Sequence, residues 1–202
     1  MSSPSELELR RLGQIADDLR ETFSERAHRI DVAVGVDPYF GTGGSPSALR
    51  RELVNGAVTR SASAIGFDFR SVCGSGKELR SLTGNVDRRY RIRRGARRAD
   101  SSLHVKVNTE SALTHVDDEG LFPVEQWAFV WTVSSENQIE EVIIAEVTGH
   151  VAGKPGFLMF GALIPLGEHR PIGGSNSFEP VDEDLPGFDD GDADGGFGQN
   201  PF

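Results

Sequence analysis

"WAFVWTVSSENQIEEVIIAEVTGHVAGKPGFLMFGALI", residues 127–164, is the stretch that decides the fold. Three runs rich in Val, Ile, Leu and aromatic residues are separated by SSENQ at 134–138 and AGKPG at 152–156. β-branched and aromatic residues favour strands, and short segments with Asn, Gly or Pro favour hairpin turns. The stretch therefore predicts three antiparallel strands joined by two hairpins.

Further strand-like segments precede this meander. They are FDFRSV at 67–72, YRIRR at 90–94 and LHVKVN at 103–108, and polar or glycine-bearing segments separate them. Helices do not alternate regularly with these strands, as they do in parallel α/β sheets. We therefore expect an antiparallel sheet.

The N-terminal third of the chain has helical periodicity. Apolar residues recur at three- and four-residue steps over 3–30, as in Leu12, Ile15, Leu19 and Phe23, and a second helix is expected from Ser45 or Ser47 to about residue 65. The apolar stripe of the first helix indicates either a core face or a contact with a second subunit in a homodimer.

The last thirty residues differ in composition from the rest. From Ser177 onward the chain has eight acidic residues and no basic ones, which leaves about −2 of the net charge of −10 for everything before it. Such a segment has too few apolar residues to form a core. The sequence thus predicts an α+β protein with a helical arm (1–65), an antiparallel β domain (66–172) and a disordered acidic tail (173–202).

Several function classes are not supported by the sequence. No apolar run approaches the length of a membrane span, and the N-terminus does not resemble a signal peptide, so we expect a cytoplasmic protein with no membrane partner. One cysteine, Cys73, precludes an internal disulfide, and the five histidines lack metal-ligand spacing. We predict no metal, no cofactor and no catalytic residue.

A run of arginines is the strongest local charge feature. Seven occur in DRRYRIRRGARRAD, residues 87–100, and strand alternation places Arg89, Arg91 and Arg93 on the face opposite Tyr90 and Ile92. Guanidinium groups form charge-assisted bonds with phosphates. The predicted nucleic-acid-binding residues are Arg88, Arg89, Arg91, Arg93, Arg94, Arg97 and Arg98.

Two other interpretations of this run are open. The arginines can be solvated or paired with carboxylates such as Asp87 and Asp100, or the acidic tail can occupy them in place of a nucleic acid. Because the tail has eight carboxylates, it can compete with a nucleic acid for a cationic surface.

The end of the tail resembles the acidic C-termini of bacterial single-stranded-DNA-binding proteins, which end in Pro-Phe and recruit other proteins. Pro201 and Phe202 match that ending, whereas Gly198, Gln199 and Asn200 replace the acids that should precede it. The resemblance implies a protein partner that binds the tail. The predicted partner-binding residues are Phe188, Phe197, Pro201 and Phe202.

A second short pattern is similar to mono-ADP-ribosyltransferases. An arginine strand is followed by Ser101-Ser102 and then by Gln138-x-Glu140. The resemblance implies NAD binding and a catalytic Glu140.

From these observations we expect a non-enzymatic binding or regulatory module. Its arginine-rich strand and loop contact nucleic acid or an acidic partner, and the tail competes for that face. The alternatives are an ADP-ribosyltransferase-like enzyme that uses NAD, or a component of a toxin–antitoxin or phage-encoded pair that acts through a protein partner.

Overall fold

The computed structural model describes residues 3–41, 44–72, 76–83, 85–107, 124–153 and 156–167. It shows N-terminal helices followed by a large, mostly antiparallel sheet, which confirms the predicted α+β class. The predicted tail, 173–202, lies outside the described residues. The helical elements are α1 (Glu6–Arg26), α2 (His28–Gly35), the 3-10 turn η1 (Pro38–Gly41) and α3 (Ser45–Ile65).

The described strands form one large and one small sheet. The strands are β1 (Asp68–Val72), β2 (Gly76–Thr83), β3 (Val86–Arg94), β4 (Ala96–Arg97), β5 (Leu103–His104), β6 (Lys106–Val107), β7 (Val124–Val133), β8 (Ile139–Val151) and β9 (Gly156–Pro165). The large sheet has the order β1-β2-β3-β7-β8-β9-β6, and β4 pairs with β5. The single strand expected at LHVKVN is therefore divided between the two sheets.

The predicted meander is confirmed by β7, β8 and β9, which pair antiparallel in sequence. In the first hairpin Asn137 has a φ of 60°, a left-handed conformation that asparagine tolerates better than most residues. The Ser134 hydroxyl oxygen accepts hydrogen bonds from the backbone N–H groups of Glu136 and Gln138. The polar residues of SSENQ therefore stabilise the turn.

One strand pair departs from the expected antiparallel arrangement. β3 and β7 run parallel, with Tyr90 opposite Trp127 and Arg94 opposite Trp131. A parallel pair needs a long crossover, and the chain from 95 to 123 is long enough to supply one. Its described part forms β4, β5 and β6 instead of a helix.

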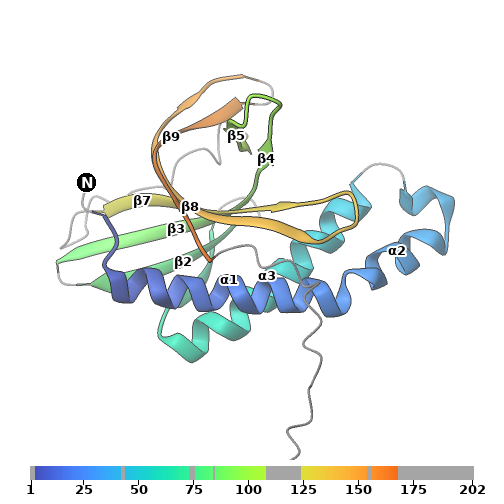
Figure 1. Cartoon of the computed structure of the whole chain (residues 1–202), viewed down its shortest axis with the longest axis horizontal. Coiled ribbons are helices and arrows are strands. Elements are labelled where there is room, and N and C mark those ends of the chain that lie inside the picture. Colours follow the sequence, from blue (N-terminus) through green and yellow to red (C-terminus); the bar gives the residue numbers. More distant parts are fainter. Residues whose placement is uncertain are drawn as a thin grey trace, which may run out of the picture. The chain divides into compact units, whose positions relative to one another are not determined.

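The helices pack on the sheet, so the stripe predicted for the first helix is a core face. Leu12, Ile15, Leu19 and Phe23 of α1 are buried in the same cluster as Trp131. Figure 1 shows α1 and α3 along one face of β2, β3, β7 and β8, with β4 and β5 on the other side. The helix expected over 3–30 is interrupted at Ala27, between α1 and α2.

The opposite face of the sheet has its own apolar cluster. Val105, Val130, Ile143 and Leu158 belong to it, so the segment from β5 to β6 packs on β7 and β8. The central strands β7 and β8 are consequently covered on both faces. The last residues of β3 lie between these two covering layers, and this position defines the candidate site.

Candidate anion-binding pocket

Strand β3 carries the first five of the seven arginines. Tyr90 is fully buried in the cluster under the helices, and Ile92 packs against the same cluster, as strand alternation predicts. Arg88 and Arg94 therefore share the helix side, and Arg89, Arg91 and Arg93 point to the opposite face. The two sets meet different neighbours.

Arg88 forms a buried cluster with two carboxylates. Its Nη1 donates to Glu8 and its Nε donates to Glu125, each at 2.8 Å, and Tyr90 Oη also donates to Glu8 at 2.8 Å. Burial opposes the charge of Arg88, but the charges of Glu8 and Glu125 outweigh burial and raise its pKa. This arginine links the first turn of α1 to the sheet and is enclosed by protein.

Arg89 is bound to Asp87, one of the carboxylates that the sequence suggested as a partner. Arg89 Nη2 donates to Asp87 at 3.0 Å, and Arg80 Nε donates to the same carboxylate at 2.7 Å. Burial alone would raise the pKa of Asp87, but the hydrogen bonds and charges of the two arginines lower it below the usual value. The carboxylate is therefore ionised and engaged.

Arg91 is bound in the same way to Glu78. Its Nε lies 3.2 Å from Glu78 Oε2, and Arg70 Nη2 donates to Glu78 Oε1 at 2.9 Å. Glu78 is fully buried. The interpretation in which the arginines pair with carboxylates thus applies to Arg88, Arg89 and Arg91. The candidates for ligand binding are the remaining four arginines of the run.

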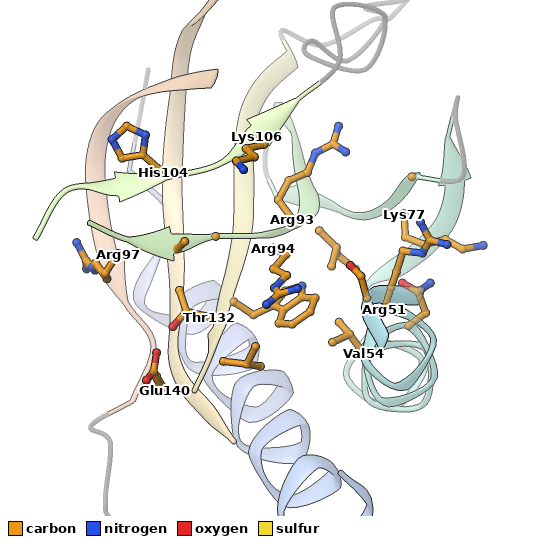
Figure 2. Close-up of a pocket in the computed structure, with 18 residues that line it drawn as sticks. Arg51, Val54, Lys77, Arg93, Arg94, Arg97, His104, Lys106, Thr132 and Glu140 are labelled. Atoms are coloured by element: carbon orange, nitrogen blue, oxygen red, sulfur yellow. The ribbon is translucent and has the colours of Figure 1, made fainter. Parts of the chain in front are cut away.

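A cavity of about 890 Å³ lies at the C-terminal end of β3. This volume is toward the upper end for ligand sites, which span about 300–1,000 Å³. Glu140 is the one carboxylate among the described lining residues, whereas six cationic side chains from α3, β2, β3, β4 and β6 line the same cavity (Figure 2). They are Arg51, Lys77, Arg93, Arg94, Arg97 and Lys106.

Arg94 is the central cation of this pocket. Its guanidinium carbon lies 5.9 Å from the Trp131 ring centroid, and it forms no hydrogen bond or ion pair with another described residue. Burial lowers the pKa of Arg94, and the charge of Arg50 lowers it further. Burial likewise lowers the pKa of Arg93, with a second contribution from Arg91. Arginine stays protonated near pH 7, so an anion in the pocket would stabilise both charges.

The other cations differ in how far they are engaged. Arg97 Nε donates to Glu141 at 2.8 Å, and Lys77 Nζ donates to the Ser71 hydroxyl at 2.6 Å. Lys106 is exposed and forms no ion pair with a described residue. Lys77 and Lys106 therefore have ammonium charges that no described carboxylate neutralises.

Two further polar atoms contribute to the lining. The Thr132 hydroxyl oxygen and His104 Nδ1 are buried and form no hydrogen bond with the described residues. Buried polar atoms are normally hydrogen-bonded, so these atoms are available to a polar ligand. The pocket thus combines cations with hydroxyl and imidazole groups.

Arg98 contributes to a neighbouring cavity. Its guanidinium lies 5.9 Å from the Phe157 ring centroid, and this second cavity of about 540 Å³ is also lined by Ser101 and Ser102. Glu140 lines the first cavity. The serine and glutamate elements that resemble an ADP-ribosyltransferase are therefore in different cavities.

Sequence reasoning named Arg93, Arg94 and Arg97 but missed Arg51, Lys77 and Lys106. The sequence feature that could have pointed to Lys77 and Lys106 is the scarcity of lysine. The chain has only three lysines, and two of them line this pocket. The predicted tail residues Phe188, Phe197, Pro201 and Phe202 lie outside the described residues.

The comparisons with known proteins add no assignment, since no family model, curated protein or solved structure matches the chain. In the part of the chain that the structure describes, no group of three His, Cys, Asp or Glu residues could hold a metal ion. No helix there is long and apolar enough to cross a membrane.

Proposed function

We propose that the protein is a non-enzymatic module that binds nucleic acid, with phosphate groups in the cationic pocket at the end of β3. The observation that carries the proposal is the charge of this pocket, where six cationic side chains face one carboxylate among the described residues. Arginine and lysine bind phosphates through charge-assisted hydrogen bonds. The pocket is large enough for more than one phosphate group.

The negative charge of the whole chain does not contradict this proposal. Eight of the carboxylates behind the net charge of −10 lie between Ser177 and Phe202. A polyanion responds to the local electrostatic potential of a cleft, and a cluster of charges of one sign strengthens this potential. The proposed site therefore needs only the local cations.

We further propose that the acidic tail, 173–202, competes for this pocket and so regulates binding. Its eight carboxylates offer the same anionic chemistry as a row of phosphates. Removing residues 173–202 should therefore increase the affinity for oligonucleotides, and the increase should shrink as salt is raised. An unchanged affinity would contradict competition by the tail, with urea unfolding as the control for intact folding.

The binding test uses a fluorescent single-stranded oligonucleotide and the Lys77→Gln/Lys106→Gln variant. If Arg51, Lys77, Arg94 and Lys106 each contact one phosphate, log K should fall with log [salt] with a slope of about −3, or about 50-fold between 50 and 200 mM. The double variant should reduce this slope by about 1.4, because two contacts are lost. Arg10→Gln, an exposed charge on α1 outside the pocket, should leave it unchanged.

Two outcomes would favour the alternatives. If the variants and the parent protein bind no oligonucleotide, even without the tail, while an acidic protein binds with the same dependence on Lys77 and Lys106, the partner is a protein. If the protein consumes NAD and Glu140→Gln abolishes this, the enzymatic alternative replaces the binding module. The position of Glu140 in the cationic pocket makes this second measurement worthwhile.

A further inference from the structure

The pocket passes around the end of β3. Arg93 and Arg94 are neighbours on one strand, so their side chains point to opposite faces of the sheet. Figure 2 shows them pointing away from each other, and both line the same cavity. A cavity lined by both residues must therefore connect the helix side of the sheet with the opposite side.

The exit of the chain at Gly95 creates this passage. The Gly95 N–H bonds to the Trp131 carbonyl at 2.9 Å, after which the chain enters β4. A Cβ at position 95 would lie 2.6 Å from Val130 Cγ1, so the backbone approaches β7 more closely than a side chain permits. β3 thus ends opposite Trp131 while β7 continues to Val133, and the described lining of the cavity includes the residues at this end of both strands.

Cations stand on both sides of the passage. Arg51 of α3 and Arg94 lie on the helix side, whereas Lys106 of β6 and Arg97 of β4 lie on the other side. In Figure 2 Arg51 and Lys106 come from separate elements on different sides of Arg94. The positive charge is therefore distributed along a bent path instead of a flat surface.

We infer that the pocket binds single-stranded nucleic acid in preference to duplex, with the strand bent around the end of β3. This inference rests on the proposed function and specifies its ligand. Duplex DNA is stiff, with a persistence length of about 50 nm, and cannot follow a bend inside one pocket, whereas a single strand can. Single-strand sites commonly combine a cationic groove with planar groups on which bases stack. The guanidinium of Arg94, itself 5.9 Å from the Trp131 ring centroid, supplies such a planar group.

The test measures the affinity of the full chain for a labelled single-stranded 12-mer and for a hairpin duplex that contains the same sequence. We expect the single strand to bind at least about tenfold more tightly. Competition by the tail lowers both affinities alike, so the ratio is independent of it. Equal affinities, or tighter binding of the duplex, would overturn the inference and leave the proposed function intact.

Two single variants test the path itself. Arg94→Gln removes charge from the helix side and Lys106→Gln removes it from the other side, so each should weaken single-strand binding about threefold or more at low salt, while Arg10→Gln should not. A mononucleotide should bind at least about tenfold more weakly than the 12-mer, because it cannot reach both sides. An effect of one variant alone, or a mononucleotide as tight as the 12-mer, would contradict the bent path. Absence of binding to every probe, with and without the tail, would overturn both proposals.

Discussion

Replacing Arg88 by Met should cost more stability than any other loss of an arginine from the run. Glu8 and Glu125 are 3% and 7% exposed, and Arg88 donates to both at 2.8 Å. Removing one partner of a buried ion pair costs about 3–5 kcal/mol because the other charge stays buried. Two carboxylates lose their partner here, so we expect the upper end, about 4–5 kcal/mol, out of the roughly 5–15 kcal/mol that stabilises a typical domain.

Urea unfolding at pH 7 measures this loss. With a slope of about 2 kcal/mol per molar urea, the midpoint should fall by about 2 M. Arg97→Met is the matched control, because Arg97 donates to Glu141 at the same 2.8 Å but both side chains are substantially exposed. Exposed ion pairs contribute about 0–1 kcal/mol, so this variant should shift the midpoint by 0.5 M or less.

A compensating variant distinguishes the effect of charge from the effect of lost packing. The triple variant Arg88→Met/Glu8→Gln/Glu125→Gln, which removes all three charges, should recover much of the loss. The reasoning is refuted if Arg88→Met and Arg97→Met differ by less than 1 kcal/mol at pH 7.

Three further predictions concern individual residues. The pKa of Asp87 is lowered, so its ionised carboxylate stabilises the fold above pH 4, and this stabilisation is lost as the pH falls. The Asp87→Asn variant should therefore show a flatter decline in urea stability between about pH 5 and 2 than the parent protein. Burial and the charge of Glu8 raise the pKa of Tyr90, so the protonated phenol stabilises the fold, and this stabilisation is lost as the pH rises above about 10. The Tyr90→Phe variant should therefore lose less stability than the parent protein between about pH 9 and 11. Gly95→Ala should destabilise the fold by about 1–3 kcal/mol, because the added Cβ would meet Val130. Gly13→Ala is the contrasting variant, because a Cβ there would lie in open space on α1. It should raise Tm and increase the free energy of unfolding by about 0.5–1 kcal/mol.

The fold was predictable where local patterns determine it. The three strands of the meander and the second helix follow from apolar runs, turn residues and periodicity. β2 was not predicted, because GKELRSLT has few apolar residues. Glu78 is buried in this strand only because Arg70 and Arg91 reach it from the neighbouring strands, and such pairing depends on sheet order instead of local sequence.

The site was predictable in part, for a similar reason. Arg93, Arg94 and Arg97 belong to the run, so their shared chemistry is visible in the sequence. The sequence also suggested that Asp87 pairs with an arginine, but it could not decide which of the seven are enclosed by protein. That division depends on α1 and β2, which bring Glu8 and Glu78 to the strand from positions distant in sequence. Lys77 and Lys106 join the pocket through the same long-range arrangement.

The contact between Arg94 and Trp131 gives this protein a built-in optical reporter. Trp131 is one of only two tryptophans in the chain, and it lines the pocket. The guanidinium carbon of Arg94 lies 5.9 Å from its ring centroid. Indole emission responds to a nearby charge, so an anion that draws Arg94 away from the ring should change the intrinsic fluorescence. Occupancy of the pocket can therefore be followed on the unlabelled protein, with Trp131→Phe as the silent reference.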